Sequence, residues 1–443
     1  MCMLMVAAAL ATPVGAHDLA VAAPTYAVGF TPDYRAIAQR AGPAVVAILV
    51  EGLRPPSFFT ERSSPSPGLG SGFLITPDGL VLTSAHVIEG GRRITVRLRD
   101  RREFSARVVG SDTVTDVAVL RIEGTDLPFL RAGSVDLLQA GDAVVAIGAP
   151  FGLEQSVSHG ILSAKGRALP GMSAVPHIQT DAPINPGHSG GPLLDAAGAV
   201  IGMHAQIYSS SGGYQGLSFA VPIDVALKVK DHLVAHGRMA HGYLGVTIQS
   251  LSPTLASAFG IAGSQGALVG GVDAGSAAES AGLRAGDIIT HVQGVPVGRA
   301  AELFAHLGPT VPGERVRLSL WRGRQTRELV VRLGEAMDAG ATGDPAESVR
   351  PEVPQELGWR LRPLTPQERV SLGTEGGLWI DGVSALSAQA GLRTGDVLLS
   401  INLKPVTTVE GVQKLMREGP SRFALLVDRD GLRLFVAISL DGS

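Results

Sequence analysis

The stretch between residues 34 and 221 most limits the fold that this chain can adopt. Short apolar runs such as 80–83 and 117–122 recur along it and are separated by turn residues such as 76–79. Runs of this length that are bounded by Gly, Pro and Asp predict β-strands. Little helix is expected before residues 222–236, which show a helical pattern. The stretch therefore predicts an all-β unit, either a sandwich or a double barrel.

An internal repeat fills the second half of the chain. Residues 281–289 read AGLRAGDII, and residues 390–398 read AGLRTGDVL. A glycine between apolar residues precedes each copy, at 244–246 and at 357–359, and a helical pattern follows each copy. A sequence that recurs in this way predicts two copies of one small domain. The residues between the copies, 335–353, are rich in Ala, Gly, Asp, Glu and Pro, which is typical of a flexible linker.

Length and charge narrow the classes of function. The 443 residues correspond to about three domains, which agrees with one large β unit and two repeats. Hydrophobic residues make up 45% of the chain and charged residues 17%, as expected for a globular protein with a sizeable core. The net charge of −3 gives no reason to expect nucleic acid as a partner.

The N-terminus resembles a secretory signal. Residues 3–11 are apolar and small, and Val14-Gly15-Ala16 resembles a cleavage site, so we expect residues 1–16 to be removed on export. The only cysteine, Cys2, would leave with them, and the mature chain would contain no disulfide. No other segment reaches the roughly 18 uncharged apolar residues of a membrane span. We therefore expect a soluble, exported protein.

Ser189 is the candidate nucleophile. It lies between glycines and just before an apolar run. A nucleophilic serine needs a tight turn of small residues, so that its hydroxyl is accessible and backbone N–H groups converge on the oxyanion. Gly–Ser clusters also form ordinary loops, so the interpretation requires a base and an acid elsewhere. His86 follows one apolar strand, and Asp116 precedes another, where a buried carboxylate needs a partner. Taken alone, each also fits a structural role.

Three histidines near the end of the helical pattern raise a metal-site alternative. His232 and His236 are four residues apart, and His241 follows shortly after. A metal site normally needs three or four convergent ligands. Histidines near a helix C-terminus also interact favourably with the helix dipole. We expect no metal and no cofactor.

These motifs together resemble one family, the HtrA/Deg serine proteases of bacterial cell envelopes. His86 in LTSAHV, Asp116 in TDVAVL and Ser189 in NPGHSGGP match the three catalytic motifs of that family, in the chymotrypsin order. The resemblance covers nearly everything after the signal. It implies an all-β dominated chain with a chymotrypsin-like double β-barrel protease domain followed by two PDZ domains. The expected bounds are 1–16 for the signal peptide, 17–236 for the protease domain, 240–334 for PDZ domain 1, 335–352 for the linker and 353–443 for PDZ domain 2.

The resemblance also implies catalytic roles. Ser189 would attack the peptide carbonyl, His86 would transfer the proton, and Asp116 would orient the imidazole. The backbone N–H groups of Gly187 and Ser189 would form the oxyanion hole. The family usually has Asn where this chain has His188. We expect the His188 side chain to point away from the hole and activity to survive.

The residues near Ser189 also predict specificity. No acidic residue stands shortly before Ser189, where a pocket for basic side chains would need one. Pro183 and Ile184 occupy that region instead, and Leu217 lies among further apolar residues. We therefore expect a small hydrophobic pocket, formed in part by Ile184 and Leu217, and cleavage after Val, Ala or similar residues.

The PDZ resemblance implies peptide binding by β-augmentation. An extended peptide would add beside the strand that follows Tyr243-Leu244-Gly245-Val246, with its C-terminal carboxylate on the N–H groups of residues 243–245. In the second copy, Glu356 precedes the glycine and would repel a carboxylate, so a role in assembly alone is an equal alternative. Residues 54–70 correspond to a regulatory loop of the family, which is short here.

The leading expectation is an ATP-independent serine endopeptidase that degrades misfolded or damaged cell-envelope proteins in the periplasm. Its partners would be unfolded substrates and C-terminal peptides, and by resemblance it would form a homotrimer or multiples of one. Two alternatives stay open: a holdase chaperone, and a PDZ-gated signalling protease that cleaves a dedicated substrate. A complete His–Asp–Ser set favours the enzyme over a binding module.

Overall fold

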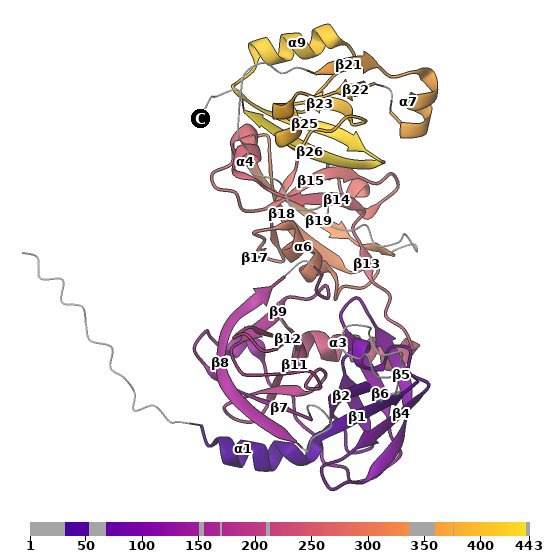
Figure 1. Cartoon of the computed structure of the whole chain (residues 1–443), viewed down its shortest axis with the longest axis vertical. Coiled ribbons are helices and arrows are strands. Elements are labelled where there is room, and N and C mark those ends of the chain that lie inside the picture. Colours follow the sequence, from indigo (N-terminus) through magenta and orange to yellow (C-terminus); the bar gives the residue numbers. More distant parts are fainter. Residues whose placement is uncertain are drawn as a thin grey trace, which may run out of the picture.

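The computed structural model describes residues 32–52, 68–149, 155–168, 171–209, 213–335, 359–374 and 376–439. The predicted signal peptide, most of the 54–70 loop, most of the linker and Glu356 lie outside these residues. Two barrels form one end of the described molecule, and two smaller sheets are stacked beyond them (Figure 1). Within the described ranges, no helix is long and apolar enough to cross a membrane.

Six strands close the first barrel in the order β1-β2-β3-β6-β5-β4. Helix α1 (Tyr34–Ala41) precedes it, and the Asp33 carboxylate caps that helix by accepting a hydrogen bond from the N–H of Ala36. The strands are β1 (Val45–Glu51), β2 (Gly68–Leu74), β3 (Leu80–Thr83), β4 (Arg93–Arg97), β5 (Glu103–Asp112) and β6 (Val117–Arg121), and the four-residue helix α2 (Ala85–Ile88) follows β3.

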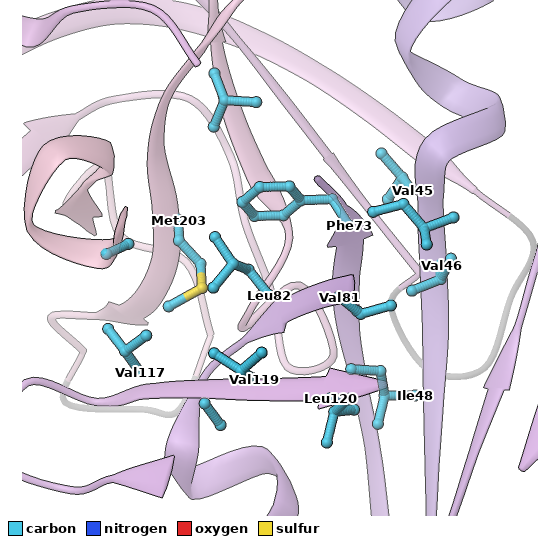
Figure 2. Packing of buried hydrophobic residues seen from close by; sticks show 14 of the residues in the cluster. Val45, Val46, Ile48, Phe73, Val81, Leu82, Val117, Val119, Leu120 and Met203 are labelled. Atoms are coloured by element: carbon cyan, nitrogen blue, oxygen red, sulfur yellow. The ribbon is translucent and has the colours of Figure 1, made fainter. Parts of the chain in front are cut away.

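The second barrel is also closed, in the order β10-β11-β12-β9-β8-β7. Two closed barrels confirm the double barrel over the sandwich. The strands are β7 (Ala143–Gly148), β8 (Ser156–Arg167), β9 (His177–Thr180), β10 (Pro192–Asp195), β11 (Val200–Ile207) and β12 (Ser218–Pro222), and α3 (Ile223–His236) follows as predicted. The hydrophobic cores meet, since Met203 of β11 lies in one buried cluster with Phe73 and Leu82 of the first barrel (Figure 2).

The two barrels approach most closely beside Ser189. Gly190 has a φ of +85°, and a Cβ there would overlap the Ser71 carbonyl oxygen and the Thr83 hydroxyl. The N–H of Ser71 donates to the carbonyl oxygen of Ser189 across the junction, at 2.9 Å. Only glycine fits both the backbone angle and the space. This junction fixes Ser189, on the second barrel, against strands of the first.

The first repeat, residues 242–335, forms a sheet in the order β14-β15-β16-β18-β19, with β17 paired to β16 and with β13 and β20 paired to each other. Helices cover one face of this sheet and bury a cluster that includes Leu303 and Leu318. Its elements are β13 (Gly242–Tyr243), β14 (Val246–Ser250), α4 (Pro253–Phe259), β15 (Ala267–Val272), α5 (Ala277–Ser280), β16 (Ile288–Val292), β17 (Val295–Pro296), α6 (Ala300–Leu307), β18 (Arg315–Arg322), β19 (Gln325–Arg332) and β20 (Gly334–Glu335).

The second repeat, residues 359–439, has the same sheet order, β21-β22-β23-β25-β26, with β24 paired to β23. The helices predicted after the two repeated motifs are α6 and α9. The elements of the second repeat are β21 (Arg360–Pro363), α7 (Pro366–Leu372), β22 (Leu378–Gly382), α8 (Ala385–Gln389), β23 (Val397–Ile401), β24 (Lys404–Pro405), α9 (Val409–Glu418), β25 (Arg422–Arg429) and β26 (Leu432–Ser439).

A buried ion pair explains why the AGLRxGD motif recurs. Asp287 is 1% exposed, accepts a hydrogen bond from the N–H of Arg284 at 2.8 Å and pairs with the Arg322 guanidinium. Asp396 repeats this arrangement with Arg429, at 2.7 Å. Each arginine also donates to the carbonyl oxygen of the motif glycine. Because a buried carboxylate needs a charged partner, each copy keeps both its Asp and its Arg.

The two repeats share a buried apolar cluster. It consists of Leu251, Leu255, Ala256, Leu268 and Ile288 from the first repeat, with Ala424, Leu426 and Phe435 from the second. The Gln249 side chain adds two hydrogen bonds to the backbone of Phe435, at 2.7 and 3.0 Å. The repeats therefore pack as one unit (Figure 1).

The first repeat also contacts the protease barrels. His241 Nδ1 lies 2.7 Å from the carbonyl oxygen of Gly308, and its Nε2 lies 2.8 Å from an oxygen of the buried Asp112. Both partners only accept, so both ring nitrogens carry protons. Burial opposes this charge, but the hydrogen bond and charge of Asp112 outweigh it and raise the pKa of His241. The ion pair joins the repeat to the loop before Asp116.

Gly308 follows α6 and lies directly against Ala174 of the protease domain, so we expect Gly308→Ala to loosen this contact. Its φ of −52° suits alanine, but a Cβ would overlap the carbonyl oxygen of Ala174. Overpacking of this kind costs about 1–3 kcal/mol. Faster trypsin cleavage near residues 237–241 and a lower first unfolding transition would report the loosening. Gly334→Ala is the matched control, because its Cβ would meet Tyr243 at an ordinary 3.6 Å. Equal behaviour of the two variants would contradict the expectation.

Candidate active site

The turn before Ser189 orients its peptide groups through hydrogen bonds. The Ser71 hydroxyl donates to the carbonyl oxygen of Gly187 at 2.6 Å and accepts from the N–H of Ala149 at 2.8 Å. The N–H of His188 donates to the carbonyl oxygen of Asn185 at 3.0 Å. Among the hydrogen bonds of the described residues, none uses the N–H of Gly187 or of Ser189. These two donors have the freedom that the predicted oxyanion hole requires.

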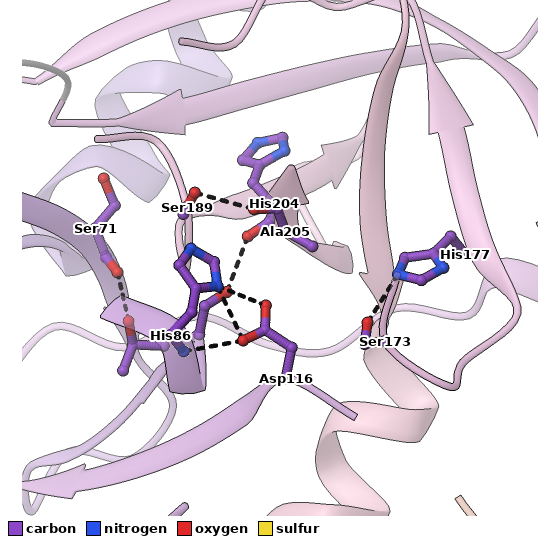
Figure 3. Close-up of polar contacts among 10 residues, drawn as sticks. Ser71, His86, Asp116, Ser173, His177, Ser189, His204 and Ala205 are labelled. Carbon is purple, nitrogen blue, oxygen red and sulfur yellow. Dashed lines mark hydrogen bonds and ion pairs between the residues drawn. The ribbon is translucent and has the colours of Figure 1, made fainter. Parts of the chain in front are cut away.

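His86 and Asp116 lie together on the first barrel (Figure 3). His86 stands on α2, one turn beyond β3, and its Nδ1 lies 2.9 Å from both carboxylate oxygens of Asp116. The backbone N–H of His86 also donates to Asp116, at 3.0 Å. Asp116 has a φ of +60°, a costly angle for a non-glycine residue. The carboxylate holds the proton on Nδ1 and leaves Nε2 free to act as a base.

The charge of His86 depends on Asp116. Burial alone would lower the pKa of His86, but the hydrogen bond and charge of Asp116 outweigh burial and raise the pKa above its ordinary value of 6.5. A base with such a pKa is strong enough to accept a hydroxyl proton and is half or more neutral at mildly alkaline pH.

The Ser189 hydroxyl points along the second barrel. It donates to the carbonyl oxygen of Ala205 at 3.0 Å, and Figure 3 shows this bond beside the His86 ring. No hydrogen bond between Ser189 and His86 is present among the described residues. A rotation about χ1 of Ser189 would redirect the hydroxyl toward the base. Catalytic hydrogen bonds are often long before substrate binds, so this geometry remains compatible with a serine–histidine pair.

One pocket of about 420 Å³ brings the predicted residues together. It is lined by His86, Thr113, Asp116, Ser173, Ile184, Asn185, Pro186, Ser189, Ala205, Gln206 and Ile207. Ile184 therefore lies where a specificity residue was predicted. Leu217, the other predicted pocket residue, does not line this pocket; it lies just before β12 and is partly buried.

His188 points away from the pocket, toward a second buried histidine. It is 4% exposed, its Nδ1 contacts the backbone of Asn185, and its ring centroid lies 6.5 Å from that of His204. Burial, and then the neighbouring His188, lower the pKa of His204 to about 3, so its ring is neutral. Neither ring nitrogen of His204 has a hydrogen-bond partner among the described residues. Sequence reasoning missed His204, because nothing near it in the chain signals its proximity to Ser189.

The candidate metal histidines separate into two places. His241 binds Asp112 and Gly308, as described above. The rings of His232 and His236 lie 5.9 Å apart on α3. The described part of the chain contains no group of three or more His, Cys, Asp or Glu side chains that could hold a metal ion.

The predicted peptide-binding loop is a tight turn before β14. The carbonyl oxygens of Leu244 and Gly245 accept hydrogen bonds from the first repeat itself, at 2.8 and 3.0 Å. Tyr243 donates its hydroxyl to Asp273 at 2.6 Å, and this bond raises the pKa of Tyr243 to about 12. Val246 begins β14, which ends its sheet and has one edge unpaired among the described strands. The matching loop of the second repeat, 356–358, lies outside the described residues.

Comparisons with known proteins agree with this architecture. Residues 70–203 match the model of a trypsin-like peptidase domain, and residues 242–333 and 382–429 each match a PDZ domain model. DegP-like periplasmic serine endoproteases of Hahella chejuensis and Pseudomonas savastanoi are each 39% identical to this chain, over 93% and 92% of it and 94% and 93% of their own length. A solved HtrA-type protease, AlgW with a tripeptide, is 37% identical with a TM-score of 0.58, over 70% of this chain and 99% of its own.

The His86–Asp116 pair predicts the pH dependence of peptide hydrolysis. Protonated His86 cannot accept the serine proton, so kcat/KM should rise with pH through a pKa above 6.5. Asp116→Asn removes the hydrogen bond and the charge that raise this pKa. We expect kcat to fall by a factor on the order of 10³–10⁴, and the residual activity to titrate at lower pH. Rates on one peptide between pH 5 and 9 would measure both effects.

Asp195→Asn is the control for this experiment. It removes one carboxylate from the same barrel, in a hairpin turn whose N–H groups an asparagine oxygen can still accept. Its pH profile should match that of the wild type. An Asp116→Asn enzyme with an unshifted profile would contradict the assigned pair.

Proposed function

The chain belongs to the family of HtrA/DegP-like serine endoproteases, and we propose that it degrades misfolded or damaged proteins of the cell envelope. It is a serine endopeptidase with a trypsin-like domain and two PDZ domains. The names of its relatives support a periplasmic location. We further propose that it works without ATP and without a cofactor, that it assembles as a homotrimer or a multiple of one, and that its protease domain spans residues 17–236.

We assign the catalytic roles to His86, Asp116 and Ser189. The observation that carries the assignment is the convergence of these three side chains on one pocket. The Ser189 oxygen would attack the peptide carbonyl carbon while its proton passes to Nε2 of His86. That proton would then move to the leaving amine as the C–N bond breaks, and a water molecule would release the acyl group by the same route. Asp116 would stabilise the imidazolium in both steps.

The oxyanion would be held by the N–H groups of Gly187 and Ser189. Each such donor is worth about 3–4 kcal/mol of transition-state stabilisation. Ser71 supports this role, because its hydroxyl binds the Gly187 carbonyl oxygen and keeps the following peptide group turned away from the hole. Ile184 in the pocket supports cleavage after small apolar residues such as Val and Ala, and a clear preference for Arg or Lys in mapped products would refute this specificity.

Ser189→Ala tests the assignment directly. We expect the wild type to cleave an unfolded protein without ATP, and the variant to lose at least 10³-fold in rate because no nucleophile remains. Product formation on a reduced, unfolded substrate would be followed by mass spectrometry. Ser371→Ala, on α7 of the second repeat and far along the chain from the pocket, is the matched control and should retain full activity. Cleavage that persists in Ser189→Ala would sink the assignment.

Two alternatives give different outcomes in the same assay. A holdase chaperone would suppress aggregation of the substrate equally well in wild type and Ser189→Ala, with little cleavage by either. A PDZ-gated protease would cleave only after a C-terminal peptide is added. The contact of Gly308 with Ala174 and the His241–Asp112 ion pair favour this gated form, because both join the first PDZ domain to the wall of the pocket.

The first PDZ domain is proposed to bind C-terminal peptides through Tyr243, Leu244, Gly245 and Val246. The unpaired edge of β14 supports β-augmentation at this position. The N-terminus of α6 lies beside the end of β14, since the N–H of Ala300 donates to the Ser250 hydroxyl at 3.2 Å.

Gly245→Ala should weaken peptide binding at least tenfold. Gly245 has a φ of +79°, and a Cβ there would overlap the side chain of Ser276, so the turn must move. Fluorescence anisotropy of a labelled peptide with a free C-terminus would measure the loss. Gly294→Ala controls for backbone strain, because Gly294 has a φ of +82° but open space around it. Equal binding by Gly245→Ala and wild type would place the carboxylate elsewhere.

A further inference from the structure

A second serine–histidine pair lies in the wall of the active-site pocket. Ser173 lines the pocket together with Thr113 and Gln206. Its Oγ lies 3.0 Å from Nε2 of His177, as Figure 3 shows to one side of Asp116. None of the catalytic roles assigned above uses either residue.

The hydrogen bonds of His177 fix the direction of the Ser173 proton. Nδ1 of His177 lies 3.3 Å from the carbonyl oxygen of Arg167, which only accepts, so Nδ1 carries the ring proton. His177 is fully buried, and burial lowers its pKa to about 4, which leaves the ring neutral at physiological pH. Nε2 is therefore an acceptor, and the Ser173 hydroxyl must donate to it. Both lone pairs of Ser173 Oγ remain available on the pocket side.

The segment that carries Ser173 is held on both sides. The N–H of Ala174 donates to the carbonyl oxygen of Val114 at 2.7 Å, and the N–H of Val175 donates to that of Ser173 at 2.9 Å. The His177 ring packs edge-on against Phe219, with centroids 6.4 Å apart. A polar group held in this way is oriented before substrate arrives, so less entropy is lost on binding.

Ser173 is not a second nucleophile. Activation of a serine requires a base that can take its proton near neutral pH. His177 has a pKa of about 4 and no carboxylate hydrogen-bonded to its ring among the described residues, so it is a weak base. What the pair offers instead is a hydroxyl oxygen that only accepts.

We propose that Ser173 is a specificity-determining residue that selects an uncharged hydrogen-bond donor, the side chain of Ser, Thr, Asn or Gln, on the amino side of the scissile bond. The amino side follows because Ala205, Gln206 and Ile207 line the same pocket, and an extended substrate can pair with this strand. An apolar side chain of equal size leaves the Ser173 acceptor unused, and a carboxylate meets only a second acceptor. The proposal rests on the catalytic roles assigned above.

Matched peptide substrates test this selection on the full-length enzyme. They share Val before the scissile bond and carry Thr or Val, or Asn or Leu, at each of the next three positions upstream. At one of these positions we expect the wild type to favour the donor by about three- to tenfold in kcat/KM, the range of one hydrogen bond. Ser173→Ala should reduce this ratio to about one, whereas Ser173→Thr, which keeps the hydroxyl, should preserve it.

Two further variants separate the proposal from its neighbours. His177→Phe keeps an aromatic ring but releases the Ser173 proton, so a Glu-containing peptide should gain relative to wild type. Thr113→Val removes the other hydroxyl of this wall and should leave the ratio intact; loss of the ratio here but not in Ser173→Ala would overturn the proposal. An equal ratio in wild type and Ser173→Ala at every position would overturn it as well.

Failure of the proposed function gives a different result. Reaction of Ser189 with a small fluorophosphonate depends on the catalytic residues and not on the upstream side chains of a peptide. It should proceed at the same rate in wild type and Ser173→Ala. A wild type that neither reacts with this probe nor cleaves any peptide would refute the catalytic assignment, whereas a reactive enzyme without side-chain preference refutes only the role of Ser173.

Discussion

The site depends on the close approach of two barrels at Gly190. Ser189 belongs to the second barrel, and His86 and Asp116 belong to the first, so the pocket exists only while the barrels hold their register. Backbone and hydroxyl groups set that register, through Ser71 and its bonds to both sides of the Ser189 turn. A side chain at Gly190 would separate the barrels and, with them, the base from the nucleophile. Packing in the shared core then stabilises what the glycine permits.

Much of this arrangement could be predicted from local sequence. The strands and α3 follow from short apolar runs and turn residues, and the repeat at 281–289 and 390–398 predicts two related sheets. His86, Asp116 and Ser189 were found because each lies in a recurring motif, and motif order supplied a pairing that no local pattern contains. The position of Ile184 was predictable for a similar reason, since it is close in sequence to Ser189 and lies on the same turn.

The rest depends on contacts between distant segments. His241 meets Asp112 across 129 positions of the chain, and neither residue's neighbours indicate the other. His188 and His204 meet because β10 and β11 are adjacent, which the sequence suggests, but their burial depends on how the turn folds over Gly148. The Ser173–His177 pair is local, yet its significance appears only when Ser173 is seen to line the same pocket as Ser189. Leu217 was misjudged for the same reason, because apolar character does not reveal which wall a residue faces.

The apolar cluster between the repeats limits how such a chain can be shortened in evolution or engineering. Leu268 and Ile288 belong to the first repeat, but they share their cluster with Phe435 and Leu426 of the second. A chain that ended after the first repeat would present this surface to water, where contiguous apolar patches favour aggregation. Removal of the second repeat therefore requires polar replacements on the first. The two repeats are separate in sequence and inseparable in solubility.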